Sequence, residues 1–128
     1  MADSSTKQAV RTDRAPEPAG PYSQAIVAGS LVFVAGQGPK NPATGTVAED
    51  VGEQTRQVLR NLGAILEAAG SSLDAAVKVT AHLGALEDFE TFNAAYREFF
   101  SEPYPVRTTV GSALLGGIKV EIDVIATR

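Results

Sequence analysis

The sequence predicts an α+β domain of two layers, in which a mixed or antiparallel β-sheet is covered on one face by two amphipathic helices. Three observations predict this class. Two segments repeat apolar residues at the helical period, several short segments are rich in β-branched residues, and glycines and prolines separate them. Because 44% of the 128 residues are hydrophobic, we expect residues 1–128 to form one domain with its own core. Residues 1–7 are expected to be a flexible N-terminal tail.

The first third of the chain is expected to form a short strand and then a hairpin. Between them lies a Pro-rich loop, APEPAGPYSQ, which places Tyr22 on a stiff segment. Gly29 can adopt the positive φ that the hairpin turn requires. A long turn-rich loop, GQGPKNPATGT, follows the hairpin. The strands are predicted over residues 8–12, 23–28 and 31–35.

The first helix is predicted over residues 50–69. Asp50 is suited to cap it, Glu53 stands three residues later as in a capping box, and Gly70 is suited to end it. Its apolar face consists of Val51, Thr55, Val58, Leu59, Leu62, Ile65, Leu66 and Ala69.

A strand, a second helix and two more strands are predicted after the first helix. Residues 77–83 alternate between apolar and polar side chains, which is typical of a strand buried on one side. Their apolar members are Val77, Val79, Ala81 and Leu83. Residues 87–100 place aromatic side chains on one stripe of a helix, namely Phe89, Phe92, Tyr96 and Phe99 or Phe100. Two prolines then precede the strands predicted over residues 106–111 and 118–126.

The last predicted strand has two unlike faces. One face is wholly apolar and should meet the helices: Ile118, Val120, Ile122 and Val124. The other mixes charged residues with an isoleucine: Lys119, Glu121, Asp123 and Ile125. A half-polar face of this kind favours partial burial against another subunit.

Composition excludes several function classes. The chain has no Cys and a single His, His82, so a dedicated zinc or iron site is not expected. A formal net charge of −4 with scattered basic residues argues against nucleic-acid binding. No segment is apolar enough for a membrane span, and the lack of Cys suits a reducing compartment, so we expect a cytoplasmic protein.

Two strand-borne charges are the first candidates for a functional site. Arg107 offers a planar fork that can bind a carboxylate through two hydrogen bonds, and Glu121 could activate or orient a water beside it. The alternative is a plain ion pair between Arg107 and Glu121 across adjacent strands.

Other candidates also have plain structural alternatives. Tyr22 could donate a hydrogen bond to a ligand or pack at a subunit contact, and Asn93 could bind a ligand or be a tolerated surface residue in a helix. His82 fits a structural or exposed role better than a catalytic one. The segment AGQG, residues 35–38, lacks a phosphate-loop pattern, but its glycines would let backbone N–H groups approach a ligand.

Five segments resemble the RidA family of reactive intermediate deaminases, also called the YjgF family. They are GPYSQAI, AGQGPKNPATG, FNAAYREFF, PVRTTV and KVEIDVIA, and the resemblance runs in order over residues 12–128. It implies a chorismate-mutase-like α+β fold that forms homotrimers through the sheet face opposite the helices, with three clefts between subunits.

The resemblance also implies an activity. Its substrates would be 2-imino acids and enamines such as 2-aminoacrylate, hydrolysed to 2-oxo acids and ammonia without a metal or organic cofactor. Arg107 would bind the substrate carboxylate and Glu121 would position water. Tyr22, Asn93 and the backbone near Gly36 would line the cleft.

Several residues depart from the family pattern. Ala35 stands where deaminating relatives commonly have serine, Thr109 where many have cysteine, and Thr108 is bulkier than usual, while the LLGGIKVE turn is one residue short. Ala35 and Thr109 would alter the substrate-binding lining, which indicates a divergent subgroup. Two alternatives therefore stay open: an enzyme acting on an intermediate of a specialised pathway, and a non-enzymatic small-molecule-binding or chaperone-like trimer.

Overall fold

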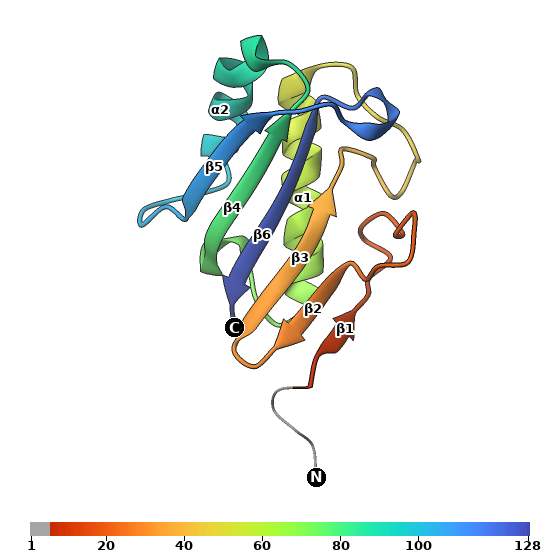
Figure 1. Ribbon diagram of the computed structural model, residues 1–128, viewed down its shortest axis with the longest axis vertical. Coiled ribbons are helices and arrows are strands. Elements are labelled where there is room, and N and C mark those ends of the chain that lie inside the picture. The colour runs from red at the N-terminus through yellow and green to blue at the C-terminus, as the bar shows by residue number, and fades with distance from the viewer. Residues whose placement is uncertain (1–5) are drawn as a thin grey trace.

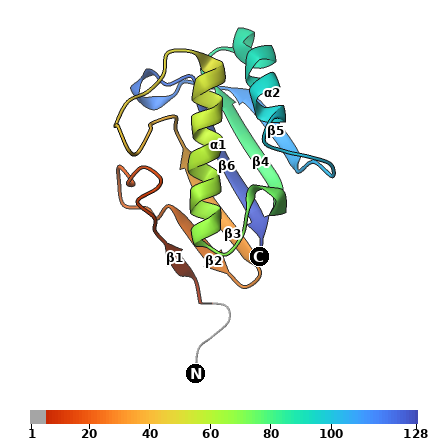
Figure 2. The ribbon, with the colours of Figure 1, turned by 180° about the vertical axis from the view of Figure 1, so that it is seen from behind.

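Six strands form one mixed sheet in the order β1-β2-β3-β6-β4-β5, and both helices cover the same face of it (Figures 1 and 2). This computed structural model describes residues 6–128, so most of the predicted tail lies outside the described residues. The strands are β1 Gln8–Val10, β2 Ala25–Ala28, β3 Leu31–Gln37, β4 Ala76–Leu83, β5 Val106–Gly111 and β6 Val120–Thr127. The predicted α+β class with two layers is confirmed.

The N-terminal hairpin forms as predicted. Strands β2 and β3 pair antiparallel, and β1 adds to β2 at the edge of the sheet. Gly29 in the hairpin turn has a φ of 61°, a conformation that glycine adopts without steric cost.

Helix α1, Val51–Ala68, begins and ends where its capping residues predict. The Asp50 carboxylate accepts the Glu53 backbone N–H at 2.9 Å. Gly70 has a φ of 80°, and the next residue, Ser71, donates its backbone N–H to Leu66 at 2.8 Å, so the end of the helix is a Schellman motif. The predicted apolar face is buried throughout.

Strand β4 corrects one prediction. The register between β4 and β6 shifts between Ala76 and Lys78, which indicates a β-bulge. The irregularity buries Ala76 and leaves Val77 44% exposed, so the prediction that Val77 faces the core is wrong. Beyond it, Val79 and the other predicted apolar positions of β4 are buried.

Helix α2, Phe89–Arg97, is shorter than predicted. A 3₁₀ turn, Leu86–Asp88, precedes it, and the chain leaves helical geometry before Phe100. The aromatic side chains still pack against one another: the Phe92 and Tyr96 rings are tilted with centroids 5.7 Å apart, and the Tyr96 and Phe100 rings are stacked with centroids 4.5 Å apart.

Strand β5 lies beside β4 and not beside β6. Helix α2 connects β4 to β5, and these two strands pair in parallel at the sheet edge, whereas β6 runs between β3 and β4. The ion-pair alternative for Arg107 and Glu121 assumes that the last two strands are adjacent, and that assumption is wrong. Strand β6 does have the two predicted faces, with Val120, Ile122 and Val124 buried and Glu121, Asp123 and Ile125 partly exposed on the open face.

Candidate functional site

Arg107 lies on the helix-covered side of β5, above the aromatic residues of α2. Its Cζ is 4.6 Å from the Tyr96 ring centroid and 5.5 Å from that of Phe92. These distances are those of cation–π contacts, which hold the guanidinium against the rings while leaving its N–H donors free. Among residues 6–128, no carboxylate lies within 4.0 Å of the guanidinium. Arg107 is thus ordered and available to an anion.

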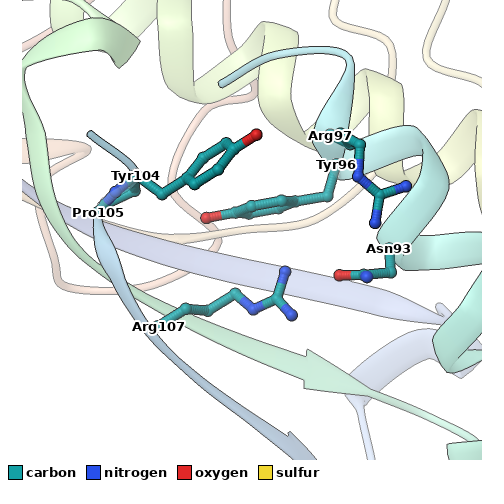
Figure 3. A pocket seen from close by; sticks show the side chains of 6 residues that line it. All are labelled: Asn93, Tyr96, Arg97, Tyr104, Pro105 and Arg107. Carbon is teal, nitrogen blue, oxygen red and sulfur yellow. The ribbon is translucent and has the colours of Figure 1, made fainter. Parts of the chain in front are cut away.

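A cavity of about 350 Å³ opens beside this guanidinium, and we call it the arginine cavity (Figure 3). Its lining contains no acidic side chain and consists of Asn93, Tyr96, Arg97, Tyr104, Pro105 and Arg107. Asn93 and Arg97 are four residues apart on α2 and therefore lie on one face of the helix. The cavity offers cationic and neutral donors and suits a small anion.

Tyr96 is the most buried of the lining residues that can donate a hydrogen bond. Its side chain is 6% exposed, and its hydroxyl has no hydrogen-bond partner among the described residues. Burial raises the pKa of the Tyr96 hydroxyl above its ordinary value, and the positive charge of Arg107 partly opposes that shift. Tyr96 is therefore neutral at physiological pH and forms the floor on which Arg107 rests.

Glu121 lies on the open face of the sheet, against Gly36. It projects from β6 opposite His82 of β4. A Cβ added at Gly36 would stand 2.5 Å from the Glu121 Oε2 atom, so any side chain at residue 36 would displace this carboxylate from its present position. This close approach explains why residue 36, the first glycine of the AGQG segment, carries no side chain.

The Tyr22 loop is fixed by a buried glutamine. The Gln24 side chain donates to the carbonyls of Thr12 and Pro16 and accepts the Thr12 backbone N–H at 2.7 Å. Tyr22 is half exposed, and its hydroxyl accepts the Ala19 backbone N–H at 3.1 Å.

A second cavity, of about 320 Å³, contains both Tyr22 and Gly36 in its lining. We call Tyr22, Gly36 and Glu121 together the glutamate half-site. Its members come from the Pro-rich loop, β3 and β6.

The remaining predicted residues lie apart from the arginine cavity. Ala35 donates its backbone N–H to the Gln24 carbonyl and sits beside Gly36 in β3. Thr109 lies two residues after Arg107 in β5 and therefore on the same face of the strand, but it does not line the arginine cavity. His82 lies on the open face, its Nδ1 3.2 Å from the Ser112 hydroxyl.

One chain does not bring Arg107 and Glu121 together. In the register, Arg107 aligns with Val79 and Glu121 with His82, three residues along the strand between them. Two strand spacings and three residue rises put their Cα positions roughly 14 Å apart, and the side chains leave opposite faces. The alternative of an ion pair across adjacent strands is therefore wrong.

The sequence prediction missed part of the arginine cavity. The sequence pattern places Tyr96 only on the apolar stripe of the helix and gives no role to Arg97 or Tyr104. The signal that could have identified them was the spacing of Asn93, Tyr96 and Arg97, because residues three and four apart on a helix share a face.

Within residues 6–128 no group of three or more acidic or histidine side chains is arranged to hold a metal ion. Over the same residues, no helix is long and apolar enough to cross a membrane.

Known proteins resemble this chain along most of its length. A family model described as Endoribonuclease L-PSP matches residues 12–128. A RutC family protein of Pyrococcus horikoshii is 48% identical over 124 residues, which cover 95% of this chain and 98% of that protein. A 2-iminobutanoate/2-iminopropanoate deaminase of Salmonella typhimurium is 46% identical over 123 residues, covering 93% of this chain and 96% of the other.

A solved structure gives the same result in three dimensions. The crystal structure of Escherichia coli TdcF with bound serine matches with a TM-score of 0.90 at 40% identity, covering 94% of this chain and 98% of TdcF. A family match that spans nearly all of the sequence, together with relatives that bear deaminase names, shows that the chain belongs to the RidA family of reactive intermediate deaminases.

Proposed function

We propose that this protein is a hydrolytic deaminase that converts 2-imino acids and their enamine tautomers, such as 2-aminoacrylate, to 2-oxo acids and ammonia. The observation that carries the proposal is the Arg107 guanidinium, which rests on the α2 aromatic rings beside a cavity without acidic residues. Such a fork binds a carboxylate through two charge-assisted hydrogen bonds. The names of the Salmonella typhimurium relative and of a chloroplast Reactive Intermediate Deaminase A of Arabidopsis thaliana support the same reaction class.

The proposed reaction needs only two charged side chains. Arg107 holds the carboxylate of a protonated imine, so the imine carbon stays in place. Glu121 accepts a proton from water as the water oxygen bonds to that carbon, and the C=N double bond becomes a C–N single bond. The proton then passes to nitrogen, the C–N bond breaks, and the oxygen forms the C=O bond of the 2-oxo acid as its second proton passes to the leaving ammonia. The nitrogen therefore leaves as ammonium, which carries the charge of the protonated imine, so atoms and charge balance.

The proposal includes a homotrimer, because both residues must meet at one substrate. Arg107 of one subunit would face the glutamate half-site of the next subunit, and a heterologous contact of this kind closes into a ring. The exposed apolar side chains on the open sheet face support an assembly, since Phe33, Val106 and Val110 are 41%, 67% and 38% exposed. The absence of Cys suits action in the cytoplasm.

An RNA substrate fits the charge of the chain less well, although the matching family model carries a ribonuclease description. RNA binding requires clustered Lys and Arg, whereas this chain has a net charge of −4.

The test measures the rate at which the protein hydrolyses imines that are generated in situ. An amino-acid oxidase generates the 2-imino acid, and semicarbazide traps whatever imine survives. The unmodified protein should speed imine loss, and Arg107→Ala should lower kcat/KM by about 100-fold, because a charged double hydrogen bond is lost. Arg60→Ala, on the exposed side of α1, is the matched control and should keep full activity. If the unmodified protein does not exceed the spontaneous rate with small, aromatic or basic imino acids, the deaminase proposal fails.

A further inference from the structure

The arginine cavity contains a second cation that deamination of a simple imino acid does not require. Arg97 lines the same cavity as Arg107, and Asn93 lies between their guanidinium groups in Figure 3. One guanidinium is enough for the single carboxylate of an imino acid such as 2-iminobutanoate. The second one therefore calls for a separate explanation.

No described residue neutralises Arg97. Among residues 6–128, no carboxylate lies within 4.0 Å of its guanidinium. The acidic residue next to it, Glu98, is engaged elsewhere, since it accepts hydrogen bonds at 3.0 and 2.9 Å from Arg56 of α1. Two positive charges thus share one cavity in a protein whose net charge is −4. A cleft lined by one sign of charge concentrates the ligand of opposite sign.

We propose that the preferred substrates are 2-imino acids with a second carboxylate in the side chain, the imines of acidic amino acids. The inference rests on the proposed function and narrows its substrate class. Arg107 binds the carboxylate next to the imine carbon, and Arg97 binds the carboxylate at the far end of the side chain. Asn93 has no side-chain hydrogen bond to another described residue and can donate to either group.

The cavity suits such a ligand in size and in chemistry. A volume of about 350 Å³ lies at the small end of ligand sites, as expected for an acid of four or five carbons. Tyr104, half exposed at the rim, adds a hydroxyl donor, so both ends of a dicarboxylate meet polar groups. The reaction is unchanged: water replaces the imine nitrogen, and the products are a 2-oxo dicarboxylate and ammonia. The substrate must come from a reaction class that oxidises or eliminates at an acidic amino acid.

The test compares two imines with the same five-carbon chain. A glutamate oxidase supplies 2-iminoglutarate, and an amino-acid oxidase acting on norvaline supplies 2-iminopentanoate, which lacks the second carboxylate. Because Arg97 is exposed, its ion pair should favour 2-iminoglutarate by about fivefold in kcat/KM. Arg97→Gln should abolish the preference, because it should lower kcat/KM about fivefold more for 2-iminoglutarate than for 2-iminopentanoate. Arg60→Gln, with the same change of net charge away from the cavity, should keep the preference. Titration with glutarate and with pentanoate should give the same ratio of affinities without any chemistry.

The outcomes separate the two proposals. If both imines are hydrolysed at equal kcat/KM, or if the preference survives Arg97→Gln, the substrate class is wrong and the deaminase proposal stands. If Arg97→Gln lowers hydrolysis of both imines equally and changes the native mass, Arg97 is a subunit contact, and the substrate class is again wrong. If neither imine is hydrolysed faster than the spontaneous rate, both the deaminase proposal and the proposed substrate class are wrong.

Discussion

Arg107 and Glu121 lie on opposite faces of one sheet, on strands β5 and β6 that are separated by β4. Their neighbours differ: the Arg107 guanidinium lies over the aromatic rings of α2, and the Glu121 carboxylate lies against the backbone of Gly36. A reaction that uses both side chains on one substrate needs two copies of the chain.

Complementation between two inactive variants tests this arrangement. Arg107→Ala and Glu121→Gln should each be inactive alone, because each removes one half of every cleft. Coexpressed with different tags, they should regain about a third of the unmodified activity in the doubly tagged fraction, since one cleft in three of every mixed trimer then has both native residues. Activity and native mass of the doubly tagged fraction are the measurements. Mixed oligomers that form and stay inactive would contradict a shared cleft.

Gly36→Ala should impair activity more than stability. Its new Cβ would stand 2.5 Å from Glu121 Oε2, but that atom ends a flexible side chain, so the carboxylate shifts and the backbone stays. We expect about a tenfold loss of kcat with little change in Tm.

Gly29→Ala is the matched control, because its φ of 61° strains alanine while nothing lies within 4 Å. It should lose about 1 kcal/mol of unfolding free energy and retain activity. The reverse pattern would show that Gly36 is needed only for folding.

Tyr96→Phe should leave stability unchanged or raise it by up to about 1 kcal/mol. The variant keeps the ring under Arg107 and removes a buried hydroxyl that has no partner among the described residues. Urea unfolding of Tyr96→Phe, beside the half-exposed control Tyr104→Phe, measures the difference. A clear loss of stability in Tyr96→Phe alone would mean that the hydroxyl has a partner in the assembled protein.

Glu98→Gln should lower the Tm near neutral pH and not in acid. Hydrogen bonding to Arg56, opposed by desolvation, lowers the pKa of Glu98 below its ordinary value of 4.5. A carboxylate whose folded pKa is depressed stabilises the protein above the unfolded pKa, and this contribution is lost as pH falls through the folded pKa. The Tm difference from the unmodified protein should therefore be small but measurable near pH 7, and it should disappear as the pH falls through the lowered folded pKa of Glu98.

Glu90→Gln changes an exposed residue of α2 that has no ion pair among the described residues, and it should show no pH-dependent difference. A difference for Glu98→Gln that persists in acid would exclude the ion pair as its cause.

Local features of the fold were predictable, whereas strand neighbours were not. The limits of α1 follow from Asp50 and Gly70, whose capping preferences act within a few residues. The position of β5 depends instead on the crossover through α2, which returns the chain beside β4. The short glycine-containing turn before β6 resembles a hairpin turn, and nothing local distinguishes the two.

The candidate site was predictable as a set of residue types and not as a place. Charged residues inside strands marked Arg107 and Glu121, because hydrophobic residues would pack there at lower cost. Which face each charge occupies depends on strand order, and which ring lies under Arg107 depends on the tertiary contact with α2. Tyr96 therefore resembled an ordinary core aromatic.

The arginine cavity is encoded in one short stretch, since its lining residues all lie between Asn93 and Arg107. The glutamate half-site is encoded elsewhere, in the segments that contain Tyr22, Gly36 and Glu121. Under the proposed function, selection on the kind of acid accepted can act on this one short segment, while Glu121 and its neighbours stay fixed. Paralogues with new substrates are then accessible through substitutions beside a retained Arg107.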